Sequence, residues 1–221
     1  MSRDPVIAID GPSASGKGTV AARVAAALGY HYLDSGALYR LVALGAQDSG
    51  MDLDDEHGLA QAASTMDVEF AEGCVRLAGR DVTSALRGEP VSVAASRVAA
   101  HPSVRRALLE RQRAFRRPPG LVADGRDMGS IVFPDAPLKV FLTADVATRA
   151  ERRHKQLMEK GMYGKMDDVV QELRRRDERD SSRPVAPLKH YPDAIFLDTT
   201  RLTIDQAVER ILGWWREKSS P

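Results

Sequence analysis

Residues 5–19, PVIAIDGPSASGKGT, constrain the fold more than any other stretch of this chain. Val6–Ile9 is a short apolar run with three β-branched residues and a glycine-rich turn after it, which is typical of a buried strand. From Gly16 onward the chain is rich in alanine, with apolar residues at helical spacing. The stretch therefore predicts a strand, a turn and a helix N-terminus, whose unpaired N–H groups and partial positive charge suit a bound phosphate.

The turn fits the pattern G-x-x-x-x-G-K between Gly11 and Lys17, but Gly18 stands where Ser or Thr is expected and Thr19 comes one place late. We expect the backbone amides to cradle an oligophosphate, with Lys17 as a mobile charge. The departure puts in doubt only the direct contact between a hydroxyl and magnesium. The alternative is a turn that merely connects a strand and a helix. The predicted phosphate-binding residues are Gly11, Pro12, Ser13, Ala14, Ser15, Gly16, Lys17, Gly18 and Thr19.

Composition narrows the class of protein. The 221 residues are 43% hydrophobic and 29% charged, which is typical of a globular domain with a sizeable core. The 32 basic and 31 acidic residues leave a net charge of +1, so no overall field favours nucleic acid or a membrane. The single cysteine, Cys74, excludes an internal disulfide and suits a reducing compartment. With no signal-like or membrane-spanning run, we expect a cytoplasmic protein.

Residues 30–49 repeat the order of strand, turn and helix. Asp34, Ser35 and Arg40 follow the predicted strand within seven residues. Open α/β sheets bind ligands at the carboxyl ends of their strands, so these side chains are candidate ligand contacts. Alternatively, Ser35 is a simple helix N-cap.

Residues 51–102 differ in pattern from the rest and predict an inserted lobe. Short alternating segments around Val68 and Val75 favour a small antiparallel hairpin. Ser96 follows and by itself would be an ordinary polar helix position. In the next predicted helix, Ser103 to about Arg117, Arg105 borders the apolar stripe and could reach a cleft, although solvation is the simpler interpretation for any one arginine there.

A third polar cluster follows the predicted buried strand Leu121–Asp124. Asp124 ends a strand that could lie beside the phosphate-binding turn, and a carboxylate there suits hydrated magnesium. Arg126 and Asp127 come next on a loop flanked by glycines. The two could form a surface salt bridge, but together with Asp124 they favour a site.

The C-terminal third supplies basic helices. After the predicted strand Lys139–Thr143, Asp145 caps a helix that carries several arginines. The helix and the glycines that end it contribute Arg149, Arg152, Arg153, Gly161 and Gly164. This pattern suits a flap that closes over polyphosphate, or else a solvated basic helix. In the next helix, Asp167 to about Ser182, Arg176, Asp180 and Arg183 share a face. The chain then closes with a strand, Ala194–Asp198, and a helix whose capping box is Thr203–Gln206.

Four segments occur in order across nearly the whole chain: GPSASGKGT, LDSGALYR, ADGRDMGSIVFPDA and RRDERDSSRPVAPL. With the inserted lobe, they resemble the bacterial cytidylate kinases, which are nucleoside monophosphate kinases. The resemblance implies a P-loop NTPase fold: an α/β/α arrangement around a central parallel sheet, in a single kinase domain over 1–221. The inserted antiparallel lobe at about 51–102 would bind the nucleoside monophosphate, and a helical lid would lie at about 149–165.

The resemblance also implies an activity, the phosphorylation of CMP and dCMP by ATP with Mg²⁺, in a monomer that binds neither nucleic acid nor membrane. The phosphate contacts of CMP would be Ser35, Arg40 and Arg126, its base contacts Ser96, Arg105, Asp127 and Arg183, and its sugar contacts Arg176 and Asp180. Lys17, Arg126, Arg152 and Arg153 would act in catalysis, and Asp34 and Asp124 would hold the metal through water.

Cytosine fits this set, because its amino group needs an acceptor such as Asp127 or Ser96 while N3 and O2 need cationic donors. Two alternatives remain at this point. The same architecture could phosphorylate UMP, dTMP or a non-nucleotide such as shikimate. Otherwise the loop could serve a nucleotide-dependent switch without an acceptor, although the sequence lacks an Asn-Lys-x-Asp motif for guanine.

Overall fold

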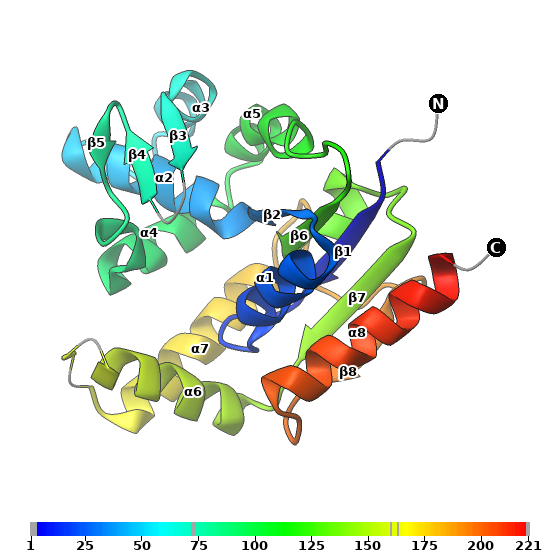
Figure 1. Cartoon of the computed structure of the whole chain (residues 1–221). Helices are drawn as coiled ribbons and strands as arrows, with labels where there is room; N and C mark the ends of the chain where they lie inside the picture. Colours follow the sequence, from blue (N-terminus) through cyan, green and yellow to red (C-terminus); the bar gives the residue numbers. More distant parts are fainter. Residues whose placement is uncertain (1–3, 72–73, 160, 163, 220–221) are drawn as a thin grey trace. The chain divides into compact units, whose positions relative to one another are not determined.

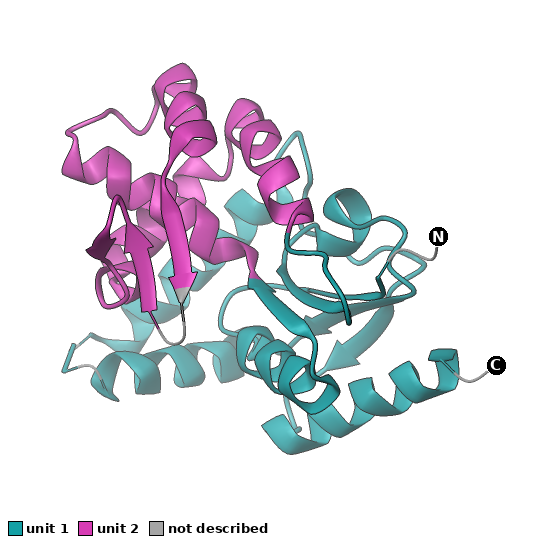
Figure 2. Ribbon diagram, turned by 45° about the horizontal axis from the view of Figure 1, so that its top comes forward, with its two compact units in different colours: residues 1–33, 115–221 teal, residues 34–114 magenta. Residues whose placement is uncertain are grey.

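A computed structural model describes residues 4–71, 74–159, 161–162 and 164–219. The chain divides into two compact units, coloured separately in Figure 2. Unit 1 comprises residues 1–33 and 115–221, and unit 2 comprises residues 34–114. The predicted lobe at 51–102 therefore falls inside unit 2, whereas the predicted lid at 149–165 falls in unit 1.

Unit 1 is built on a five-stranded parallel sheet with the strand order β2-β6-β1-β7-β8 (Figure 1). The strands are β1 (Val6–Asp10), β2 (His31–Asp34), β6 (Leu121–Gly125), β7 (Leu138–Thr143) and β8 (Ile195–Asp198). The central strand, β1, pairs with β6 on one side and with β7 on the other. Since every residue of β1 except Asp10 is fully buried, the strand reads as a continuous apolar run. This register sets Asp10, just before the phosphate-binding loop, opposite Gly125.

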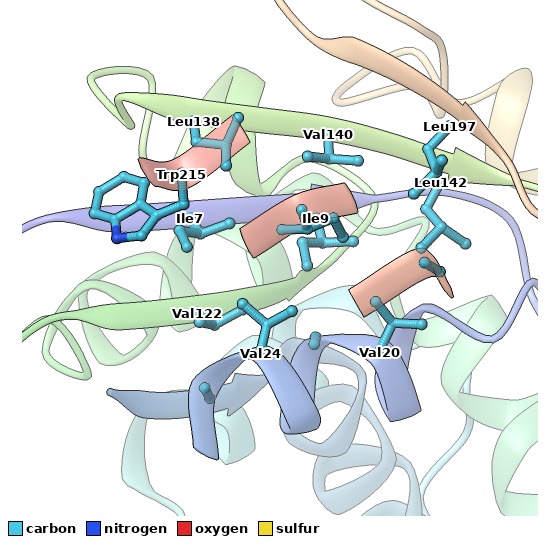
Figure 3. Packing of buried hydrophobic residues seen from close by; sticks show 14 residues of the cluster. Ile7, Ile9, Val20, Val24, Val122, Leu138, Val140, Leu142, Leu197 and Trp215 are labelled. Carbon is cyan, nitrogen blue, oxygen red and sulfur yellow. The ribbon is translucent and has the colours of Figure 1, made fainter. Parts of the chain in front are cut away.

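Two helices cover one face of this sheet, α1 (Lys17–Leu28) and α8 (Ile204–Ser219). Their apolar stripes and the inward side chains of the strands form one buried cluster. Figure 3 shows Ile9 of β1 facing Val20 and Val24 of α1. The helix α8 begins at the predicted capping box, in which Thr203 Oγ1 accepts from Gln206 N and Gln206 Oε1 accepts from Thr203 N. This core fixes the strand ends from which the loops of the site emerge.

The remaining elements of unit 1 are a short π-helix, η2 (Met128–Val132), and the helices α6 (Val146–Glu159) and α7 (Met166–Ser181). Asp145 caps α6 as predicted, since its Oδ1 accepts from Thr148 N at 2.6 Å. The two long helices pack side by side (Figure 1) through the buried residues Ala150, Val169 and Leu173. No helix of the described residues is long and apolar enough to cross a membrane.

Unit 2 combines helices with a three-stranded antiparallel sheet of order β3-β4-β5. Its elements are α2 (Ser35–Asp48), α3 (Glu56–Thr65), β3 (Val68–Ala71), β4 (Cys74–Leu77), β5 (Arg80–Asp81), the 3-10 turn η1 (Ala85–Arg87), α4 (Glu89–Val98) and α5 (Pro102–Arg113). Within the unit, α2 packs against α4 and α3 packs against α5. The predicted hairpin is confirmed, with Val68 opposite Leu77.

The N-cap alternative for Ser35 and one expected helix boundary were wrong. Helix α2 begins at Ser35, because the carboxylate of Asp34 caps it by accepting from Ala37 N at 3.1 Å. Ser35 is therefore not the N-cap. Helix α5 ends at Arg113, with Ala114 as its C-cap, and not at about Arg117.

Candidate functional site

The phosphate-binding loop joins β1 to α1 and is shaped by its backbone. Gly16, the N-cap of α1, has φ of 90° and makes no side-chain cap hydrogen bond, so no capping side chain accepts from the first N–H groups of the helix. A Cβ at Gly11 would lie 1.9 Å from the carbonyl oxygen of Leu142 in β7, so only glycine fits there. Ser15 Oγ donates to Pro12 O at 3.0 Å and closes the loop on itself. The loop therefore has the form that holds a phosphate on main-chain amides.

Lys17 lies at the start of α1 and turns back over this loop. Its Nζ donates to Pro12 O at 3.2 Å and lies 3.8 Å from Asp124 Oδ1. Asp124 comes from β6, the strand next to β1, as the sequence predicted. Its other oxygen accepts from the hydroxyl of Tyr32 at 3.4 Å. A buried lysine and a buried carboxylate thus flank the same helix N-terminus.

The glycine at position 18 has a steric reason. A Cβ there would lie 3.0 Å from Asp124 Oδ2 and 3.6 Å from the hydroxyl of Tyr32. Any side chain at this position, a Ser or Thr included, would push against the carboxylate. With glycine at position 18, the carboxylate of Asp124 therefore lies where a Ser or Thr side chain would otherwise be.

The donors near the loop fit a hydrated magnesium ion better than a metal held only by protein. Among the described residues, no group of three or more His, Cys, Asp or Glu side chains could hold a metal ion. Magnesium characteristically takes one or two carboxylates and keeps water and phosphate oxygens as its other ligands. Asp124 can serve in this way. Asp34 in unit 2 is more committed, because it caps α2 and also accepts from Arg40 Nη2 at 2.6 Å.

Arg126 is held by three acceptors, one of them in the phosphate-binding loop. Nη2 donates to Ser13 Oγ at 2.9 Å, Nε to Asp180 Oδ2 at 2.9 Å, and Nη1 to Gly125 O at 3.0 Å. Burial alone would lower the pKa of Arg126, but the charge of Asp180 and its hydrogen bond raise it above the ordinary value. The guanidinium is therefore a fixed cation beside the loop.

Asp180 of α7 is the centre of a buried network of charges. Its second oxygen accepts from Arg183 Nη2, and the side chain is almost fully buried. Burial works to raise the pKa of Asp180, but the charges of Arg126, Arg183 and Arg176 together hold it below its usual value. The sequence predicted Arg176, Asp180 and Arg183 on one helix face. In the structure Arg183 lies beyond the end of α7, and both arginines act on Asp180.

The three arginines of α6 differ in their surroundings. Arg149 forms a two-point ion pair with Asp177 of α7, at 2.6 and 3.0 Å, and also donates to Ser13 O at 3.3 Å. Arg152 donates to Ser15 O at 3.0 Å and to both oxygens of Thr199, at 3.1 and 2.7 Å. Both are therefore tied to the loop. Arg153 contacts Gln156 on its own helix, at 3.4 Å.

Two further carboxylates, those of Asp10 and Asp127, lie near Asp124 and Arg126. The Asp10 carboxylate accepts from Met128 N at 2.8 Å and from Gly129 N at 2.9 Å. Burial, opposed by these two hydrogen bonds and assisted by the charges of Asp127 and Asp124, raises the pKa of Asp10 to about 7. Asp127 itself is almost fully buried. Three carboxylates therefore gather at the ends of β1 and β6, with Arg126 among them.

Unit 2 carries the other predicted contacts. Ser35 and Ser96 are nearly inaccessible to solvent. Arg105 is also buried, donates to Ala99 O at 3.1 Å and lies 5.5 Å from the ring centre of Tyr39. The solvated alternative for Arg105 was therefore wrong, because the helix turns this arginine toward α2.

The structure thus groups the predicted residues in two sets. Unit 1 holds the loop Gly11–Thr19 and the charged side chains Asp124, Arg126, Asp127, Arg152, Arg153, Arg176, Asp180 and Arg183, and unit 2 holds Asp34, Ser35, Arg40, Ser96 and Arg105. Sequence reasoning missed Asp10, Tyr32, Asp177 and Thr199. Only Asp10 had a local signal, its place at the end of a buried strand just before the loop. The others join segments far apart in sequence.

The chain is similar to known proteins along nearly its whole length. The family model described as cytidylate kinase matches residues 7–217. A cytidylate kinase from Chromobacterium violaceum is 59% identical over 216 residues, covering 98% of this chain and 97% of the relative. One from Burkholderia pseudomallei strain K96243 is 59% identical over 217 residues, covering 98% and 95%. The crystal structure of TT1252 from Thermus thermophilus matches over 100% of both chains with 22% identity and a TM-score of 0.48. On its sequence, the chain belongs to the cytidylate kinase family.

Proposed function

We infer that this protein transfers the γ-phosphoryl group of ATP to CMP, and also to dCMP, by in-line displacement without a covalent enzyme intermediate. Membership of the family supports the reaction class. The structural observation that carries the proposal is the contact of Arg126 with Ser13 Oγ. It joins a cation suited to an acceptor phosphate to the loop suited to the donor phosphates.

On the donor side, we assign the β-phosphate to the backbone amides of Gly11–Thr19 and the γ-phosphate to Lys17. The amides are pre-oriented by the loop and cost no rearrangement when charge develops. Asp124 and Asp34 would hold Mg²⁺ through water, and the ion would supply positive charge to the phosphates of the nucleotide. Before nucleotide binds, the contact with Asp124 would keep the Lys17 side chain over the loop. The phosphates of the nucleotide would then replace Asp124 as its partner.

On the acceptor side, Ser35, Arg40 and Arg126 would bind the phosphate of CMP, and Arg176 and Asp180 would bind its sugar. Asp127 and Ser96 can accept from the cytosine amino group, and Arg105 and Arg183 can donate to N3 and O2. Uracil has an oxygen and an N–H where cytosine has an amino group and N3. UMP would leave buried groups of this set unpaired, so the set discriminates against it.

The arginines that close over the transferring phosphoryl group would come from the lid. Arg152 has the more direct support, because it already donates to Ser15 O in the loop, and Arg153 is the alternative. Arg149 is the anchor of this group, since its ion pair with Asp177 ties α6 to α7. We also propose that the protein acts as a cytoplasmic monomer and binds no nucleic acid or membrane. Among the described residues, no contact favours a UMP or dTMP kinase, or a switch without an acceptor.

The test is ADP release from ATP with a panel of acceptors: CMP, dCMP, UMP, dTMP, AMP and shikimate. We expect CMP and dCMP to be used, and UMP to have a kcat/KM at least about 100-fold lower, since two buried hydrogen bonds lose their partners. Faster use of another acceptor would overturn the substrate assignment. ADP release that no acceptor stimulates would overturn the kinase assignment.

A further inference from the structure

One side chain joins the strand of the phosphate-binding loop to the segment that follows Arg126 and Asp127. Asp10 is the last residue of β1 and directly precedes Gly11. Its two carboxylate oxygens accept from the backbone N–H groups of Met128 and Gly129, at 2.8 and 2.9 Å. Hydrogen bonds from N–H groups to a carboxylate are shorter and stronger than those between neutral groups. The two bonds therefore join the end of β1, where the phosphate-binding loop begins, directly to the loop that follows β6.

These two bonds fix the backbone on which the Asp127 side chain is mounted. The N–H of Met128 lies in the peptide plane that ends Asp127, so a bond to it holds the ψ angle of Asp127. In the same peptide group, the carbonyl oxygen of Asp127 accepts from Ile131 N at 2.9 Å and from Val132 N at 3.2 Å. The peptide is thus held at both of its polar atoms. Of these bonds, only those from Asp10 come from outside the segment.

We propose that Asp10 is a positioning residue for acceptor recognition, which sets Arg126 and Asp127 in register with the phosphate-binding loop. The inference rests on the proposed function, in which those two residues contact CMP. Besides the bond of Arg126 to Ser13 Oγ, two ties hold this register. One is the main-chain pairing of β1 with β6, which sets Asp10 opposite Gly125, and the other is the Asp10 carboxylate. Sites work best when such supporting bonds lock the groups that touch substrate.

The positioning role predicts a selective loss. Without the carboxylate, the phosphate-binding loop keeps Gly11, Gly16 and the strand pairing, so ATP should still bind. The peptide between Asp127 and Met128 gains freedom, so contacts to cytosine and to the acceptor phosphate should weaken. A residue that merely stabilised the fold would affect both substrates alike, or neither.

The experiment compares wild-type protein with Asp10→Ala and Asp10→Asn, using steady-state kinetics with CMP and UMP at saturating ATP and calorimetric titration of ATP. We expect Asp10→Ala to raise KM for CMP at least tenfold and to lower the preference for CMP over UMP by a similar factor, with the Kd for ATP within threefold. Asn keeps one acceptor for Met128 N but turns an amide toward Gly129 N, so Asp10→Asn should be intermediate. It also serves if the alanine variant does not fold.

Asp205→Ala is the matched control, because Asp205 of α8 accepts from Arg23 Nη1 at 2.5 Å and has no part in the proposed site. It should leave KM for CMP unchanged. The inference is overturned if both Asp10 variants keep KM and selectivity within twofold of wild type, or if KM for CMP and Kd for ATP rise by the same factor. A wild-type protein that does not use CMP would instead refute the proposed function itself.

Discussion

The phosphate-binding loop and the network around Asp180 are both suited to binding charged groups, but they are built differently. The loop is made of backbone: Gly11 and Gly16 create its shape and the first turn of α1 supplies the donors. The network is made of side chains, in which Arg126 and Arg183 both donate to the buried carboxylate of Asp180. The loop suits a group common to all nucleotides. The network suits a particular partner, because each side chain has its own chemistry.

Loss of the mobile charge in the loop should have the largest effect on turnover. We expect Lys17→Met to lower kcat about 10³-fold, the loss typical of removing a charged donor from a transferring group. Coupled ADP release measures it, and the melting temperature should stay close to that of wild type. Lys139→Met is the matched control, because that side chain is 13% exposed against 10% for Lys17 and pairs with Asp193 at 2.6 Å. Similar losses in both variants would contradict the role of Lys17.

Filling the tightest point of the loop should disturb the fold itself. Gly11→Ala would place Cβ 1.9 Å from the Leu142 carbonyl oxygen, so β1 and β7 must separate. We expect the free energy of unfolding to fall by about 3 kcal/mol or more, measured by urea denaturation. Gly29→Ala, at φ of 65° with open space around it, should cost only about 1 kcal/mol. Equal costs at the two glycines would show that Leu142 does not limit the loop.

Breaking the network should cost stability in a way that depends on pH. Asp180→Asn leaves Arg126 and Arg183 without their charge partner, and we expect a loss of about 2 kcal/mol at pH 7. The folded-state pKa of Asp180 lies below its ordinary value, so its contribution is present above about pH 4 and is lost as the pH falls further. Urea denaturation at pH 7 and pH 3 should show the difference between wild type and variant shrinking. If the wild type and the variant differ in free energy of unfolding by the same amount at both pH values, the charge of Asp180 is not the source of the stability.

Restoring the common motif should not improve the enzyme. Gly18→Ser would place Cβ 3.0 Å from Asp124 Oδ2, and we expect kcat to fall about tenfold as the carboxylate is displaced. Gly18→Ala adds the same Cβ without a hydroxyl and should lose a similar amount. A serine variant that gains activity while the alanine variant loses it would show that a hydroxyl is wanted at position 18.

The same contrast explains what the sequence could predict. The loop, its strand and its helix were predictable because glycine spacing and apolar periodicity act over a few neighbouring residues. The hairpin of unit 2 followed from the same kind of local pattern, whereas the central parallel sheet of unit 1 was implied by the resemblance to a family. Thr203 and Gln206 were predicted as a capping box for that reason, and the structure confirms it.

The contacts between distant segments could not be predicted in this way. The bond of Arg126 to Ser13 joins residues 113 positions apart, and that of Arg152 to Ser15 spans 137. Periodicity carries no information on such pairs. The resemblance to a family supplied candidate residues, but it did not show that Asp34 caps α2 or that Asp10 holds the segment after Asp127.

The central claim is that the γ-phosphoryl group passes directly to CMP. The most direct measurement follows ATP labelled with ³²P in its γ-phosphate, incubated with the enzyme and CMP and separated by chromatography. The account predicts label in the β-phosphate of CDP, in amounts equal to the ADP formed, and almost none as inorganic phosphate. Label released mainly as inorganic phosphate, or at a rate that CMP does not change, would contradict it.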